Sequence, residues 1–358
     1  MKKKVIAMGL CAAIALSLGA CTGAGQSASV GSGASGAASA ASEGQTGTAP
    51  AADAVVLKLA FNQSENHPQY KALAEMGEKL KEQTNGKYVI EIHPNELLGS
   101  QKDAFELVQS GSIQMAMVAN SIVENVNKDF AVIGLPYIYD SQEHQKKVFT
   151  SGALDELFAA TSAANNGFDV LTAFTAGARS VYTDKPIHTP ADLKGYKIRV
   201  MESPTCISML NYMGGVGTPM SQGEVYTAIQ QGTINGGENN EITYADLKHY
   251  EVAPYFSYTQ HMMVPDLLII NTDIHNAMPD DVKEIFSKLV KETTEREFEL
   301  WNQQIDSAKK TAIDGGATFV EDVDIKPFQE ACKPLHDEIT ATSENAKKLY
   351  DAVRALAE

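Results

Sequence analysis

The sequence predicts an α/β protein with two domains, and three observations carry this prediction. From residue 55 onward, strand patterns alternate with helix patterns, which is typical of an open sheet with mainly parallel strands. The roughly 300 residues beyond this point are too many for one comfortable core. Residues 279–314 show one long helical pattern, which would span roughly 50 Å and so bridge two domains. Two helices broken near Thr293 are the alternative.

The first part of the pattern is regular. Ligands in open α/β sheets bind beyond the carboxyl ends of the strands, so the residues that follow each strand matter most. Asn62, Glu65 and His67 follow the first predicted strand, and Asn120 follows the third. The sequence predicts strands at 55–61, 88–93 and 113–118, and helices at 68–82 and 100–109.

The next part holds two arginines within predicted strands. Arg179 lies in a strand region at 171–182. Arg199 lies in a strand at 197–201, whose side chains alternate between an apolar and a polar face. On spacing alone, Arg199 fits a solvated strand face as well as a binding site. The remaining predicted elements are a helix start at 189–193, a helix at 224–231 and a short strand at 233–235.

The N-terminus reads as a processing segment. A basic patch precedes an apolar run from Val5 to Leu18, which is short for a bilayer span of about 20 residues. The ending Leu-Gly-Ala-Cys resembles a bacterial lipobox. It implies a signal peptide over 1–20 and a lipid on Cys21, with an ordinary secretory signal as the alternative. Residues 21–54 are mostly Ala, Gly, Ser and Thr, which predicts a flexible tether.

Charge and cysteine content narrow the classes of partner. The formal net charge of −16 disfavours nucleic acid and anionic membrane surfaces. An anionic ligand must therefore be held by individual positive side chains. Cys206 and Cys332 remain once the N-terminal cysteines are set aside, and they are either buried free thiols or one disulfide.

Catalytic and metal motifs are missing from the sequence. It contains no GxSxG, GxxxxGK[ST] or HExxH pattern, and its eight histidines lack ligand spacing. The one GxGxxG match lies in the tether, where it follows no strand. Glu65 near His67 is weak evidence for an acid/base pair. We therefore expect no enzyme, no metal and no cofactor.

An ordered set of motifs resembles the solute-binding subunits of TRAP transporters, the DctP-type family. The central region reads GARSVYTDKPIHTPADLKGYKIRV, followed by TPM, EVYTAIQQG and GGENN, and the earlier region reads LGSQKDAFELVQSGSIQMAMV. The resemblance covers residues 55–358. It implies a periplasmic-binding-protein-like fold with hinge strands and a long helix spanning both domains. One domain would be 55–176 plus 265–304, and the other 177–264 plus 305–358.

The resemblance also implies a carboxylate site. It assigns the ligand carboxylate to Arg199, with Arg179 and Asn239 as further contacts. A guanidinium suits this task because its planar fork matches a carboxylate. The alternatives are an interdomain salt bridge for Arg179 and a turn-forming role for Asn239.

First-domain contacts implied by the resemblance would hold the rest of the ligand. Glu65 could instead be an exposed loop acid, and His67 a helix-entry residue, while Gln101 and Asn120 could be caps. Gln222 stands where many family members have an aromatic residue, which suggests a more hydroxylated ligand. The implied first-domain contacts are Asn62, Glu65, His67, Gln101 and Asn120.

Together these features predict an extracytoplasmic, lipid-anchored monomer that binds a sugar acid and delivers it to a TRAP permease. Uptake in the family is driven by an ion gradient. The alternatives are a C4-dicarboxylate or another organic acid as ligand, an ABC importer or sensor as the partner system, and an anchored hydrolase.

Overall fold

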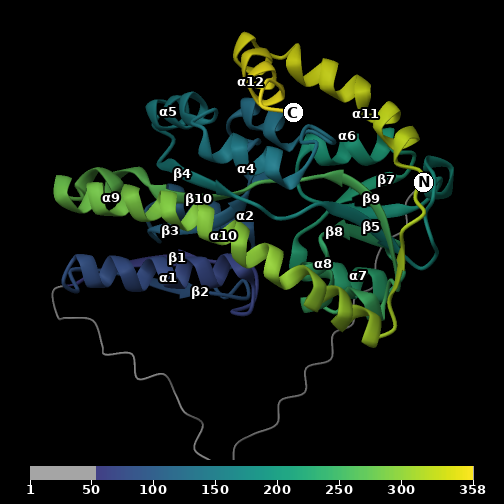
Figure 1. The fold of residues 1–358 in the computed structure, drawn as a ribbon, viewed down its shortest axis with the longest axis horizontal. Helices are drawn as coiled ribbons and strands as arrows, with labels where there is room; N and C mark the ends of the chain where they lie inside the picture. Colours follow the sequence, from purple (N-terminus) through teal and green to yellow (C-terminus); the bar gives the residue numbers. More distant parts are fainter. Residues whose placement is uncertain (1–53, 358) are drawn as a thin grey trace, which may run out of the picture. The chain divides into compact units, whose positions relative to one another are not determined.

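Two β-sheets with helices packed around them form the body of the protein (Figure 1). The structure, a computed structural model, describes residues 54–357. The predicted signal peptide, the tether up to residue 53 and Cys21 therefore lie outside the described residues. Both sheets are mixed, but a single strand in each runs antiparallel to the others, so the predicted α/β class with mainly parallel strands is confirmed.

The first sheet has five strands in the order β2-β1-β3-β10-β4. The first three strands along the chain are parallel, as the alternating pattern predicted. The parallel prediction fails at β10, which runs antiparallel to both of its neighbours. Its strands are β1 (Val55–Ala60), β2 (Tyr88–His93), β3 (Met115–Ala119), β4 (Phe168–Phe174) and β10 (Asp266–Asn271).

The second sheet has six strands in the order β11-β9-β5-β8-β6-β7. Strands β6, β7 and β8 pair in parallel, whereas β5 runs antiparallel to β8 and β9. Its strands are β5 (Arg179–Thr183), β6 (Lys197–Val200), β7 (Val216–Pro219), β8 (Gly236–Asn239), β9 (Tyr255–Met262) and β11 (Thr318–Val320).

The chain passes between the two sheets at residues 175–178 and again at 263–265. Two of the predicted domain boundaries, at 176/177 and 264/265, fall in these crossings, whereas the one at 304/305 falls within a helix. The division into domains stays a prediction. After β11 the C-terminal helices return toward the first sheet's side, because Arg354 of α12 donates to Asp140 just before α4.

Twelve α-helices cover the sheets within residues 54–357. They are α1 (Pro68–Gln83), α2 (Gln101–Gln109), α3 (Asn120–Val123), α4 (Gln142–Thr150), α5 (Asp155–Ala163), α6 (Pro204–Tyr212), α7 (Val225–Gln230), α8 (Glu241–Asp246), α9 (Thr272–Ala277), α10 (Asp280–Asp314), α11 (Ile325–Thr340) and α12 (Glu344–Arg354). None of these helices is long and apolar enough to cross a membrane. Four 3₁₀ helices add Lys128–Gly134, Pro190–Leu193, Gln222–Glu224 and His249–Glu251.

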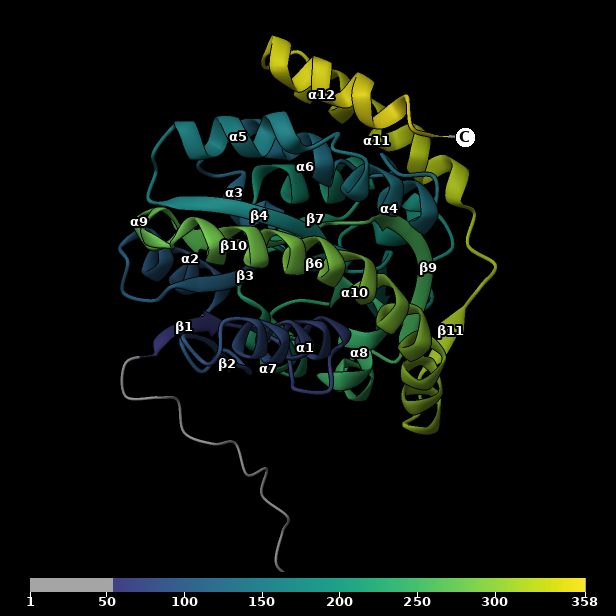
Figure 2. The same ribbon diagram turned by 60° about the vertical axis from the view of Figure 1, so that its left-hand side comes forward.

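Helix α10 is unbroken over 35 residues, so the prediction of one long helix is confirmed and the break near Thr293 is not found. Thr293 and Thr294 instead bond back to backbone carbonyls one turn earlier. The helix packs on α1 and β4 of the first sheet and on α8 beside the second sheet (Figure 2). Pro279 is its N-cap rather than its first residue.

Two shorter predictions need correction. The predicted strand at 233–235 is a turn, and the strand of this region is β8, which begins at Gly236. The helix start at Thr189 is real, with a capping box to Asp192, but it opens only a short 3₁₀ helix.

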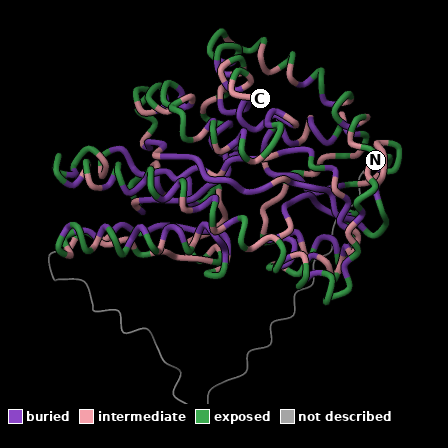
Figure 3. The backbone as a smooth tube through the Cα atoms, in the orientation of Figure 1, coloured by how far each residue is buried: buried purple, intermediate pink, exposed green. Residues whose placement is uncertain are grey.

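The central strands of both sheets are buried, whereas the edge strands β2 and β7 and the outer helix faces are more exposed (Figure 3). Strand β6 has neighbours on both edges, and Ile198, Arg199 and Val200 are all buried. The solvated-face interpretation of Arg199 is therefore wrong. Cys206 and Cys332 are both buried free thiols, so the disulfide alternative is not found.

Candidate functional site

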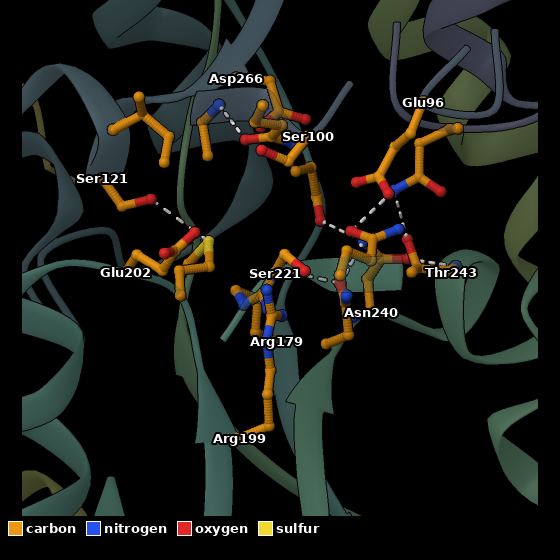
Figure 4. A pocket seen from close by; sticks show the side chains of 18 of the residues that line it. Glu96, Ser100, Ser121, Arg179, Arg199, Glu202, Ser221, Asn240, Thr243 and Asp266 are labelled. Carbon is orange, nitrogen blue, oxygen red and sulfur yellow. Dashed lines mark hydrogen bonds between the residues drawn. The ribbon is translucent and has the colours of Figure 1, made fainter. Parts of the chain in front are cut away.

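A pocket lies between the two sheets and encloses about 580 Å³ of empty space, including its open mouth (Figure 4). Polar and charged side chains dominate its lining. The residues that line it are Gln63, His67, Glu96, Ser100, Gln101, Ala119, Ser121, Ile122, Ala176, Arg179, Arg199, Met201, Glu202, Ser221, Gln222, Asn239, Asn240, Thr243 and Asp266.

Two opposing surfaces of this pocket carry its charged groups. We call Arg179, Arg199 and Asn239 the arginine wall, which strands β5, β6 and β8 of the second sheet supply. We call His67, Glu96, Gln101 and Asp266 the acidic wall, which the first sheet and its connections supply. In Figure 4, Arg179 and Arg199 point into the pocket from one side, while Glu96 and Asp266 lie across from them.

Arg179 is already paired within its own sheet. Its Nε and Nη2 donate to the two carboxylate oxygens of Glu238, at 2.5 and 2.9 Å, and Nη2 also reaches the Glu238 carbonyl. His261 lies 3.3 Å from the same carboxylate. Burial works to raise the pKa of Glu238, but the Arg179 charge and these hydrogen bonds outweigh it and bring the pKa to about 2. The charge of Arg179 is thus largely compensated, by a salt bridge inside the second sheet.

Arg199 is buried without such a partner. Its Nε donates to the Met220 carbonyl at 2.8 Å, which fixes the direction of the guanidinium. Its two terminal nitrogens donate to no side chain or backbone group in residues 54–357. Burial lowers the pKa of Arg199, although Glu238 opposes this effect. A buried cation that lacks a partner is costly, so the site favours an anion here.

Asn239 lines the pocket and accepts a hydrogen bond from Arg179. Its Oδ1 accepts from Arg179 Nη1 at 2.9 Å and from the Asn240 backbone, which leaves its amide nitrogen toward the pocket. The glycines before it are required by packing, because a Cβ at Gly237 would lie 2.5 Å from the Tyr182 hydroxyl. The Gly-Gly-Glu-Asn order therefore combines close strand packing with an ion-pair partner and a free amide donor.

On the acidic wall, Asp266 begins β10 and is held by Gln69. Gln69 donates from Nε2 to Asp266 Oδ2 at 2.9 Å and to the Thr175 carbonyl at 2.8 Å. Burial raises the pKa of Asp266 to about 6, against the opposing effects of Gln69 and Arg179. Asp266 is therefore mostly ionised at neutral pH.

Behind Asp266, Glu297 of α10 is fully buried. Its Oε2 accepts from the Thr175 backbone at 3.1 Å, and its Oε1 has no partner among the described residues. Burial, with a further contribution from Asp266, raises the pKa of Glu297 well above its usual range. Burial therefore disfavours the charged form of Glu297.

His67 and Gln101 enter the acidic wall from helix starts. His67 is the N-cap of α1, and its ring packs edge-on against Trp301. Burial lowers the pKa of His67 to about 3, so the ring is neutral. Gln101 opens α2, and its Oε1 accepts from the Ala119 backbone at the end of β3. His67 thus has the helix-entry role considered as the alternative, whereas the cap of α2 is Ser100 and not Gln101. Both His67 and Gln101 line the pocket.

Three predicted residues do not line the pocket. Glu65 is exposed in the loop before α1. Asn120 is buried but points away, because its amide donates to the Phe130 carbonyl at 2.9 Å. Asn62 contacts the lining only through Gln222, whose Oε1 accepts from it at 3.3 Å. The predicted residues that line the pocket are His67, Gln101, Arg179, Arg199, Gln222 and Asn239.

Side chains from the two sheets also meet at the rim of the pocket. Gln63 donates to Gln222 and to Thr243, both at 3.4 Å. On another side, Glu124 follows α3 and accepts from the backbone and hydroxyl of Thr205, at 3.2 and 2.8 Å. Thr205 belongs to the first turn of α6. These contacts hold the pocket in a closed arrangement.

The sequence reasoning missed the two acids of the acidic wall. Glu96 comes shortly after β2, so inspecting strand ends could have found it. Asp266 comes at the start of a strand and falls outside that rule. It reaches the same edge because β10 is antiparallel, which places Asp266 opposite Ala119 at the end of β3.

This fold and pocket are those of a solute-binding protein. Residues 59–343 match the family of bacterial extracellular solute-binding proteins, family 7, known as DctP. The chain belongs to this family, and the resemblance to TRAP solute-binding subunits is confirmed.

Solved structures and relatives agree with this membership. A TRAP periplasmic solute-binding protein from Anaerococcus prevotii, with bound D-glucuronate, is 37% identical with a TM-score of 0.81, over 84% of this chain and 97% of that one. One from Xanthobacter autotrophicus, with bound β-D-galacturonate, is 32% identical with a TM-score of 0.79, over 84% and 99%. A solute-binding protein of Chromohalobacter salexigens is 32% identical over 76% of this chain and 81% of its own length.

Proposed function

We propose that this protein binds a hexuronate in the pocket between its sheets and that Arg199 holds the ligand carboxylate. The observation that carries the proposal is the buried Arg199 guanidinium, whose two terminal nitrogens have no partner in the described chain. A carboxylate fits this fork in a bidentate way. Arg179 cannot offer the same fork, because Glu238 occupies it.

Asn239 and Arg179 would complete the carboxylate subsite. The amide nitrogen of Asn239, a residue that lines the same pocket as Arg199, makes no hydrogen bond within residues 54–357. Arg179 would act mainly by positioning Asn239, because Glu238 compensates its charge. His67, Gln101 and Gln222 would face the remainder of the ligand, together with Glu96 and Asp266.

The rest of the lining supports a hydroxylated ligand. Amide, hydroxyl and carboxylate groups surround the space beyond Arg199 and need hydrogen-bonding partners once water is displaced. A hexuronate has several hydroxyls to meet them. Two similar proteins with bound glucuronate and galacturonate add support. A C4-dicarboxylate is the second candidate, which the sequence considerations left open.

Isothermal titration calorimetry on the purified protein tests the ligand. We expect saturable binding of D-glucuronate or D-galacturonate and much weaker binding of succinate and malate. Binding of succinate or malate, with no heat from any uronate or aldonate, would exclude the proposal. A turnover assay on glycosides and esters should give no product, which separates binding from hydrolysis.

We further propose delivery to a TRAP permease driven by an ion gradient. Family membership supports this partner. Deleting the TRAP permease genes of the host should abolish uptake of the bound acid and leave binding intact. Dependence of uptake on ATP-importer subunits would instead identify an ABC system.

The proposed anchor is a lipid on Cys21. The support is the sequence pattern at residues 18–21, which lies outside the described residues. Cys21→Ser should abolish acyl labelling and release soluble protein. A variant that stays acylated and membrane-bound would contradict the lipobox interpretation. We expect the released protein to be a monomer in size-exclusion chromatography.

A further inference from the structure

The charges around the pocket are unevenly compensated. On the arginine wall, Glu238 neutralises Arg179 and leaves Arg199 as the cation without a carboxylate partner. On the acidic wall, no Lys, Arg or His nitrogen of residues 54–357 lies within ion-pair distance of Asp266. The pocket therefore has an anion-accepting side and an anion-rejecting side.

Asp266 is fixed with one oxygen left for a ligand. Its Oδ2 accepts from Gln69, a fully buried side chain that also bonds the Thr175 carbonyl. Its Oδ1 makes no hydrogen bond within the described chain, although Asp266 lines the pocket. The orientation is thus set before any ligand arrives, which is what a selective contact needs.

Other groups around Asp266 do not reverse the negative charge that it presents to the pocket. Arg179 acts on it from across the pocket but is bound to Glu238. Glu297 lies behind it with one bonded oxygen. His67, on the same wall, has no hydrogen bond to it. Asp266 therefore presents an acceptor with a negative charge.

A carboxylate accepts hydrogen bonds and cannot donate them. A ligand hydroxyl can donate to Oδ1, whereas a second ligand carboxylate would meet a like charge. We propose that Asp266 is a specificity-determining residue, which selects acids that carry a hydroxyl at this end and rejects acids that carry a second carboxylate. This inference rests on the proposed function, and it goes further by explaining how dicarboxylates are refused.

The test compares two ligands that differ at one end. D-Galacturonate and galactarate share their carboxylate and chain hydroxyls, and galactarate replaces the C1 aldehyde or its ring form with a second carboxylate. We expect wild-type protein to bind galacturonate at least about 10-fold more tightly. Asp266→Asn keeps the shape and an acceptor oxygen for Gln69. We expect it to weaken galacturonate binding roughly 10- to 100-fold and to reduce the preference over galactarate about 10-fold.

Wild-type protein and Asp266→Asn are tested with the same two acids. A change in preference between these proteins therefore cannot come from the difference in shape between the acids. Asp273→Asn is the matched control, since it removes the same charge at an exposed position on α9. It should keep the wild-type preference. Circular dichroism checks the fold, and Asp266→Ser serves if Asp266→Asn does not fold.

Each outcome bears on a different claim. Equal affinity of wild-type protein for both acids would overturn the inference and leave the proposed function standing, as would an unchanged preference in folded Asp266→Asn. Binding of neither acid by wild-type protein would overturn the proposed function and the inference with it. The inference is supported if the preference for galacturonate over galactarate becomes smaller in Asp266→Asn and stays unchanged in Asp273→Asn.

Discussion

The arginine wall and the acidic wall meet the same pocket but are built on opposite principles. The arginine wall is a hydrogen-bonded unit, in which Arg179, Glu238 and Asn239 satisfy one another and Arg199 is left open. The acidic wall is a set of separate side chains, of which Asp266, Gln101 and His67 are each held by a different contact. In the proposed binding mode, one sheet prearranges the carboxylate end of the ligand site, whereas the hydroxyl end can vary residue by residue.

Removing Glu238 should give the largest effect, because it leaves the Arg179 guanidinium buried and unpaired. Glu238→Ala should lower the free energy of unfolding by about 3–5 kcal/mol, measured by urea denaturation with circular dichroism. The matched control is Glu75→Ala. Glu75 forms a similar two-bond pair with Arg296, but on the surface. That variant should cost about 0–1 kcal/mol. Equal costs would show that the arginine wall is not a buried unit.

Arg199 should dominate binding rather than stability. Arg199→Ala should weaken uronate binding by about 2–5 kcal/mol, or roughly 30- to 3,000-fold by calorimetry. Arg199→Lys should also lose affinity, because an ammonium cannot reproduce the fork. Arg296→Ala, which removes an exposed arginine, serves as the control. An affinity of Arg199→Ala within threefold of wild type would remove Arg199 from the site.

The stability of the protein should depend on pH through Asp266 of the acidic wall. The pKa of Asp266, about 6 in the folded protein, lies above the ordinary value of 3.8. This group favours folding fully below pH 3.8, and the contribution is lost as pH rises through 6. The variant Asp266→Asn has no carboxyl group to ionise at this position, so it does not lose this contribution as pH rises. Its stability relative to wild type should rise by about 2 kcal/mol between pH 4.5 and 7.5. A difference that stays flat over this range would mean that Asp266 is not desolvated.

Residues at the rim of the pocket should contribute least to uronate binding. Asn62 donates to Gln222 over a long 3.3 Å bond and does not line the pocket. Asn62→Ala should therefore weaken uronate binding by only about 0.5–1.5 kcal/mol, through a looser Gln222. Gln222→Ala, which alters the lining itself, should cost at least as much. A larger loss for Asn62→Ala would assign Asn62 a direct ligand contact, as the sequence first suggested.

The same contrast explains what could be predicted from sequence. The α/β class and the long α10 follow from local patterns, because alternation and capping are properties of short segments. The residues of the arginine wall came from the family resemblance instead, since spacing alone left Arg199 undecided. The partner of Arg179 was not predicted, since it depends on β5 lying beside β8. Asp266 was missed for a related reason. Its place at the pocket depends on an antiparallel strand that crosses from the other sheet, and no local signal reports strand direction.

The contact between Glu124 and Thr205 has a consequence for the dynamics of α6. This helix has its first turn completed by a carboxylate that belongs to the other sheet's side of the pocket. Fraying of that turn and separation of the two sides are therefore coupled into one opening event. A ligand that keeps the sides together slows amide exchange at the start of α6, although no residue of α6 lines the pocket. Amide exchange at the start of α6 therefore reports whether the two sides of the pocket are together.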